Sequence, residues 1–198
     1  MLKLYTHELS GNCYKARLML SLLGLEYEAV PINVVENEQK PPQFLKLNPL
    51  GQVPVLIDGD TVIRDSQAIL VYLARCYGGE NWLPLDAESM SKVVQWLSTA
   101  ANEIQNSLAA ARLYFLLNAQ VDLKLAQHRA KHVLQVMNEH LQERDWLELA
   151  RPTIADIACF PYVGLAADGK IPLESYPHVL SWIDRLKKLP GYVGMPGL

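Results

Sequence analysis

Three short motifs contain residue types that could bind or activate a small ligand. The first, Ser10-Gly11-Asn12-Cys13, lies between a strand-like run, Leu2–Tyr5, and a helical pattern over residues 12–23. A helix N-terminus stabilises anions through its free N–H groups and partial positive charge. A hydroxyl or amide at this turn can also donate a hydrogen bond to a bound thiolate and so lower the thiol pKa. The alternative is that Ser10 or Asn12 only caps the helix.

The second motif runs from Asn48 to Pro54 and ends where a β run begins. Proline is normally excluded from a strand unless the strand lies at an edge or the bond is unusual. A cis Val53–Pro54 bond would turn the backbone N–H and C=O of Val53 outward, free to pair with an extended peptide. A trans edge proline is the alternative, since cis bonds are only about 5–6% of X–Pro bonds. Given the neighbouring motifs, we predict the cis bond.

The third motif, Arg64-Asp65-Ser66-Gln67-Ala68-Ile69, has the pattern of a helix start. In the simpler interpretation, Asp65 or Ser66 caps the helix. In the other, Ser66 and the helix amides hold a carboxylate while Asp65 accepts a hydrogen bond from an ammonium group. The two residues would then bind the head group of an α-amino acid.

The elements that position these motifs follow a β-α-β order, a connector with a short helix, a hairpin and a final helix. Asp58-Gly59 between two β-rich runs predicts the hairpin. A β-α-β unit gives a parallel strand pair and the hairpin adds antiparallel strands. The sequence therefore predicts a mixed four-stranded sheet of thioredoxin-like order, with all three motifs at the ends of its strands.

The second half of the chain has a different pattern. Gly78–Pro84 has linker composition, and only helical periodicity follows Asp86. We expect helices over residues 91–118, 123–144, 153–166 and 177–189. The fold class is α/β plus all-α, with one domain over residues 1–78 and a helical one over 86–198.

Composition limits the function. The 18 basic and 21 acidic residues give a net charge of −3, so no basic face large enough for nucleic acid is expected. No apolar run is long enough to span a membrane, and the N-terminus lacks the apolar core of a signal peptide. Three widely spaced cysteines fit reduced thiols. We expect a cytoplasmic protein that acts on a small molecule or on another protein.

Taken together, the motifs resemble the glutathione S-transferase family over the whole chain. The matching segments are LYTHELSGNCYKARL, FLKLNPLGQVPVL, IRDSQAILVYLA, RPTIADIACFPYV and YPHVLSWIDRLKKLPGY. The resemblance implies that glutathione is a co-substrate whose thiolate attacks a small electrophile or a peroxide. It also implies a homodimer with no metal and no tightly bound cofactor.

The resemblance also assigns roles in binding the tripeptide. Val53 precedes the family's cis proline, Pro54, and would pair with the cysteinyl backbone of glutathione. Asp65 and Ser66 match the pair that binds the γ-glutamyl end. The remaining matches are Lys40 and Gln52 near the glycyl carboxylate, and Glu103, which would reach the glutathione of the partner subunit.

Two residues are candidates for activating the thiol. Ser10 resembles the hydroxyl of serine-type members, and Asn12 resembles the asparagine of some bacterial members. Ser10 lies in the loop, whereas Asn12 begins the helix and is the candidate cap, so we expect Ser10 to contribute more. For the electrophile site we expect the loop Thr6–Leu9, the C-terminal tail over residues 191–198, and the inward-facing residues Gln105 and Arg112.

Two other functions stay open. Cys13 could form a mixed disulfide with glutathione in a disulfide reductase, although the helical pattern places it on the apolar face with Ala16 and Leu20. The chain could also be a non-catalytic binding protein of the same fold, because fold does not fix function.

Overall fold

The computed structural model describes all residues, 1–198, and begins with the predicted mixed sheet. Its strand order is β2-β1-β3-β4, in which β1 pairs parallel to β2 and antiparallel to β3, and β3 pairs antiparallel to β4. The strands are β1 (Leu2–Thr6), β2 (Tyr27–Pro31), β3 (Val55–Asp58) and β4 (Thr61–Arg64). The turn between β3 and β4 uses Gly59 at φ +57°, a left-handed conformation that glycine adopts without strain.

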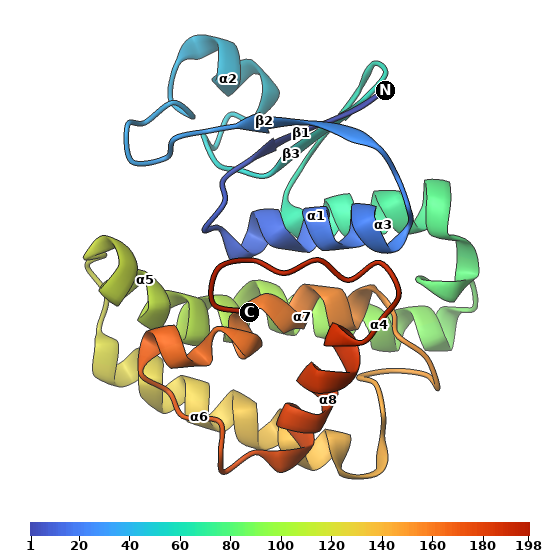
Figure 1. The fold of residues 1–198 in the computed structure, drawn as a ribbon, viewed down its shortest axis with the longest axis vertical. Coiled ribbons are helices and arrows are strands. Elements are labelled where there is room, and N and C mark those ends of the chain that lie inside the picture. Colours follow the sequence, from blue (N-terminus) through green and yellow to red (C-terminus); the bar gives the residue numbers. More distant parts are fainter.

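Two helices cover one face of this sheet, and Figure 1 shows them side by side between the sheet and the helical domain. They are α1 (Gly11–Leu22) and α3 (Ser66–Leu73), while the short α2 (Pro42–Leu47) lies on the other side of the sheet. Leu2 and Leu4 of β1 are buried, as the alternation of apolar residues requires. Since α1 and α3 begin at the ends of β1 and β4, their N-termini meet at one edge of the sheet.

The helical domain departs from the predicted pattern mainly in its first helix. The expected single helix over 91–118 starts earlier and contains a π-helical stretch. Its parts are α4 (Ala87–Thr99), the π-helical η3 (Ala100–Ala109) and α5 (Ala110–Leu117). Helical periodicity in a sequence does not separate α from π turns, so only the structure reveals η3. The other helices are α6 (Leu123–His140), α7 (Ile154–Gly164) and α8 (Pro177–Lys187), with short helical turns at 74–78, 79–81, 141–143 and 166–169.

A buried carboxylate fixes the start of α7. Asp156 is fully buried and accepts hydrogen bonds from the backbone N–H groups of Leu147 and Thr153 and from Trp182 Nε1, each at 2.9 Å. Thr153 and Asp156 form a capping box. Asp156 therefore ties α7 to the preceding loop and to α8.

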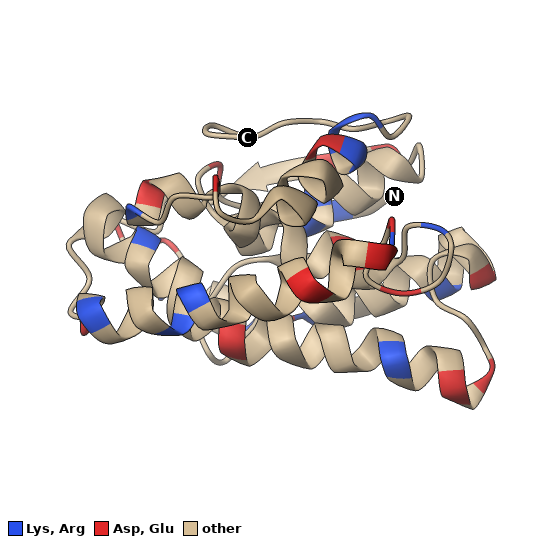
Figure 2. Ribbon diagram, turned by 90° about the horizontal axis from the view of Figure 1, so that it is seen from below, with Lys and Arg blue, Asp and Glu red and all other residues tan.

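The two domains share one apolar core. Buried side chains continue without interruption from β1, α1 and α3 into α4, α7 and α8, and α7 packs directly against α1 and α3. Figure 2 shows acidic and basic residues interspersed along the helices. None of the helices combines the length and the apolar character that crossing a bilayer requires.

Candidate active site

The first loop divides two roles between neighbouring polar residues. Ser10 is the N-cap of α1, and its Oγ accepts a hydrogen bond from the N–H of Cys13 at 3.2 Å. Asn12 is not a cap, which corrects the sequence expectation. Its Nδ2 donates to Gln105 Oε1 at 3.2 Å, and its Oδ1 lies 3.4 Å from Ser66 Oγ. The amide of Asn12 therefore faces the start of α3 and the helical domain.

The first turn of α1 is held close to α7. A Cβ atom on Gly11 would lie 2.7 Å from Cε1 of Tyr162, so only glycine allows this approach. The N–H groups of Gly11 and Asn12 lie in the first helical turn, where no intrahelical acceptor exists. The N–H of Asn12 faces the hydroxyl of Tyr162, and the turn presents the partial positive charge of the helix N-terminus beside the Asn12 side chain.

The loop before β3 contains the cis Val53–Pro54 bond, as predicted. Asn48 holds this loop: its Oδ1 accepts from the N–H of Leu50 at 3.1 Å and its Nδ2 donates to the carbonyl of Gln52 at 2.8 Å. Asn48 had no predicted role, although an asparagine that accepts from the N–H two residues later forms a recognisable Asx turn.

Lys40 and Gly51 complete the loop. Gly51 has φ +58°, and a Cβ atom there would lie 2.9 Å from the Lys40 ammonium. Lys40 Nζ donates to the carbonyl of Gly51 at 3.1 Å. Lys40 therefore supports this loop through its ammonium.

At the start of α3, Asp65 is a cap and also has a free oxygen. Its Oδ1 accepts from the N–H groups of Gln67 and Ala68 at 2.9 and 3.1 Å, and its φ is +75°. No hydrogen bond involves its Oδ2, and the side chain is exposed. Ser66 beside it is buried, and its hydroxyl also contacts Oε1 of Gln67. Asp65 can therefore cap α3 with Oδ1 and still bind a ligand with Oδ2.

These three segments meet around one small cavity of about 80 Å³. Its lining contains most of the residues expected for glutathione, together with Asn48, Leu50 and Arg64: Asn12, Asn48, Leu50, Gln52, Val53, Pro54, Arg64, Asp65 and Ser66. Ser10 and Lys40 are not in the lining. Arg64 adds a cation that the sequence reasoning missed, because the last residue of a short strand gave no signal of its own.

The residues expected at the electrophile site reach the first loop from the helical domain. Gln105 contacts Asn12, as described above. Arg112 is almost fully buried, and its Nη1 donates to the carbonyl of Leu9 at 2.8 Å while its Nε donates to Asp168 Oδ2 at 2.9 Å. Both side chains face inward, as predicted, and Arg112 ties α5 to the loop that precedes α1.

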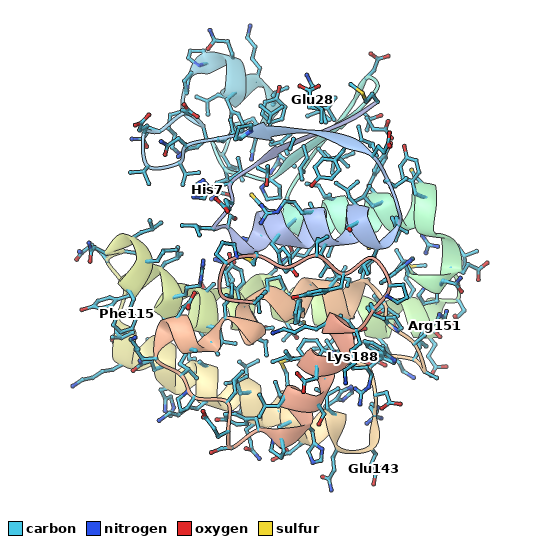
Figure 3. All side chains as sticks on the ribbon, in the orientation of Figure 1. His7, Glu28, Phe115, Glu143, Arg151 and Lys188 are labelled. Carbon is cyan, nitrogen blue, oxygen red and sulfur yellow. The ribbon has the colours of Figure 1, made fainter.

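A larger cavity of about 570 Å³ opens on the other side of this loop. It is lined by Thr6–Glu8, Arg17, Pro31–Asn33 and the tail residues Gly194–Pro196, so it joins the loop and tail that we expected at the electrophile site. Gln105 and Arg112 are not part of its lining. Figure 3 shows His7 where the chain leaves β1 and turns into α1.

Two further candidates lie away from the small cavity. Cys13 is fully buried, as predicted, and burial raises the pKa of its thiol. Glu103 is exposed and lines a separate cavity of about 370 Å³ between α4 and α6. Any contact of Glu103 with glutathione would therefore need a second subunit.

Known proteins match the chain across both domains. The family models for the glutathione S-transferase N-terminal and C-terminal domains match residues 1–75 and 104–190. Glutathione S-transferase 3 of Zea mays is 32% identical over 96% of this chain and 91% of its own.

Solved structures of similar proteins also match this chain over nearly its whole length. A glutathione S-transferase from Pseudomonas fluorescens has a TM-score of 0.93 and 32% identity over 98% of both chains. A homologue from Lodderomyces elongisporus, solved with two glutathione molecules per subunit, has a TM-score of 0.85 and 27% identity, covering 96% of this chain and 94% of its own. With its two-domain fold and the small cavity at the sheet edge, the chain belongs to the glutathione S-transferase family.

Proposed function

We propose that this protein transfers the thiolate of glutathione to a small electrophile. One observation carries the proposal: three loops that are distant in sequence bring an amide, the cis-proline segment and the Asp65–Ser66 helix start to one cavity. These groups match the three parts of glutathione: thiol, peptide backbone and amino-acid head group.

In this proposal each wall of the cavity binds one part of the tripeptide. Val53 offers its backbone to the cysteinyl residue beside Pro54. The free Oδ2 of Asp65 accepts from the γ-glutamyl ammonium, while the backbone N–H and hydroxyl of Ser66 bind the adjacent carboxylate at the start of α3. Gln52 and Lys40 serve the glycyl end. Lys40 can do so if its ammonium either leaves the carbonyl of Gly51 or donates to that carbonyl and to the glycyl carboxylate at once.

We assign thiol activation to Asn12 ahead of Ser10. Ser10 does not line the cavity, whereas Asn12 lines it and its Nδ2 carries a second N–H besides the one donated to Gln105. Together with the partial positive charge at the N-terminus of α1, this amide favours the thiolate over the thiol.

The reaction itself needs only ionisation and proximity. The thiol proton leaves to solvent, and the sulfur electron pair forms the new bond to the electrophilic carbon. The leaving group departs with the electron pair of the bond that breaks. We propose that the electrophile binds beside the first loop, near Leu9, Gln105 and Arg112, where the helical domain faces the thiol.

The two alternatives make different demands. A disulfide reductase that uses Cys13 needs an exposed thiol of low pKa, and the buried Cys13 does not meet that requirement. A non-catalytic binding protein needs only the same cavity, so activity must separate it from the enzyme.

The test is capture on immobilised glutathione followed by an assay with 1-chloro-2,4-dinitrobenzene. Binding with turnover supports the proposal, and binding without turnover of this or other electrophiles supports the binding-protein alternative. Failure to bind glutathione at all would reject both.

We also propose a homodimer in which Glu103 of one subunit approaches the glutathione of the other. Its position in a separate cavity between α4 and α6 supports this role. Sedimentation measures the assembly directly. In a dimer, Glu103→Ala should weaken glutathione binding without changing the fold, and a monomeric active protein would remove this role.

A further inference from the structure

Lys15 is a buried cation with no hydrogen-bond or ion-pair partner. Its side chain is fully buried, and its ammonium forms no hydrogen bond or ion pair. A buried charge without a partner destabilises the folded chain, because the lost hydration is not replaced. Neither the fold nor the proposed catalytic groups described above account for its presence.

The ammonium lies behind the first turn of α1. Lysine side chains on a helix point back toward its N-terminus, and Nζ of Lys15 is 5.6 Å from the ring centroid of Tyr162. This is the same ring that packs against Gly11, one turn earlier. The charge is therefore close to the first turn of α1, which carries Asn12.

The groups around the ammonium do not neutralise it. α7 contributes the thiol of Cys159 and the phenol of Tyr162, and burial raises the pKa of both, so both are neutral at pH 7. The N-cap of α3 contributes Asp65, an exposed carboxylate that favours the charged ammonium without contacting it. Burial lowers the pKa of Lys15 to about 8, so the side chain is still mostly protonated at pH 7.

We propose that Lys15 is a positioning residue whose buried positive charge favours the anionic form of glutathione's thiol at the start of α1. This inference rests on the proposed function, because it requires glutathione in the small cavity. The charge acts through the interior of the protein, where a field is less screened than in solvent. A unit charge at ~10 Å, at an effective dielectric constant of ~20, changes a thiol pKa by ~1 pH unit.

The test compares Lys15→Met, which keeps the length of the side chain and removes its charge, with Lys15→Arg, which keeps the charge. Lys187→Met, at an exposed position near the end of α8, is the matched control for net charge. For each protein, the ultraviolet absorbance of bound thiolate is titrated against pH, and the melting temperature is measured.

We expect Lys15→Met to raise the pKa of bound glutathione by about one pH unit, which is about a tenfold decrease in the ionisation constant of the thiol. We also expect a higher melting temperature, because the uncompensated charge is gone. Lys15→Arg and Lys187→Met should keep the thiol pKa of the wild type. If Lys15 were purely structural, its replacement by methionine would not raise the melting temperature and at the same time raise the thiol pKa of bound glutathione.

Several results would overturn the inference. They are an unchanged thiol pKa in Lys15→Met, a lower melting temperature or misfolding of that variant, or a thiol pKa in Lys15→Arg as high as in Lys15→Met. If Lys15→Met binds S-methylglutathione more weakly but keeps the thiol pKa, the charge of Lys15 instead favours a carboxylate of glutathione. If the wild type itself does not lower the thiol pKa of glutathione, the proposed function fails, which is a distinct outcome.

Discussion

Replacing Asn12 by alanine is the sharpest test of how the thiol is ionised. The substitution removes an amide that bridges Gln105 and Ser66 and lines the cavity. A hydrogen bond to a charged group contributes ~1.5–3 kcal/mol. Losing such a bond to the thiolate should raise the pKa of bound glutathione by ~1–2 pH units.

Ser10→Ala is the matched variant, because it removes one polar group from the same loop. Its hydroxyl oxygen caps α1 through the N–H of Cys13, so the expected result is a loss of ~1 kcal/mol in stability with little change in the thiol pKa. Cys13→Ala should leave the thiol pKa unchanged as well, since Cys13 is buried away from the cavity.

The assay is the thiolate absorbance of the enzyme–glutathione complex titrated against pH, with thermal melts for each variant. A raised thiol pKa in Ser10→Ala with an unchanged one in Asn12→Ala would refute this reasoning and return the role to Ser10. Loss of all turnover only in Cys13→Ala would instead favour the disulfide reductase.

Three other substitutions test the binding site and the core. Asp65→Asn keeps the cap and removes the charge, so glutathione affinity by calorimetry should fall about tenfold to a hundredfold with little change in melting temperature; unchanged affinity would mean that Asp65 is only a cap. Asp156→Ala leaves three buried N–H groups without acceptors and should lower the free energy of unfolding by roughly 3–5 kcal/mol, whereas a loss below ~1 kcal/mol would contradict this account. Because the folded-state pKa of Lys15 is lowered from 10.5 to about 8, the unfolded chain binds more protons between these values and stability should rise with pH across that window, by up to about 3 kcal/mol. This increment is measured as the wild type minus Lys15→Met, which cancels the buried tyrosines and cysteines, and equal pH profiles for the two proteins would disprove it.

The sheet and the second and third motifs were predictable because their signals are local. Asp58-Gly59 between two β runs specifies a hairpin, and the β-α-β order specifies the parallel pair. The cis bond at Pro54, by contrast, was predicted from its neighbours, since proline alone favours the trans form.

The roles of Ser10 and Asn12 in the first loop depend on which of the two side chains turns toward α3 and α7. Ser10 and Asn12 are both good caps, so local propensity does not separate them. The choice follows from tertiary packing: Tyr162 presses on Gly11 and sets the position of the first turn, and Gln105 lies opposite Asn12 and accepts from its amide. Gln105 belongs to the π-helical stretch η3, and the periodicity of the sequence does not reveal the wider turns of a π-helix. The burial of Lys15 was not predicted for a related reason. A lysine on a helix is normally exposed, and only the arrangement of α1, α3 and α7 shows that this one is buried. Residues whose roles depend on packing between domains are thus those for which the structure changed the sequence-based assignment.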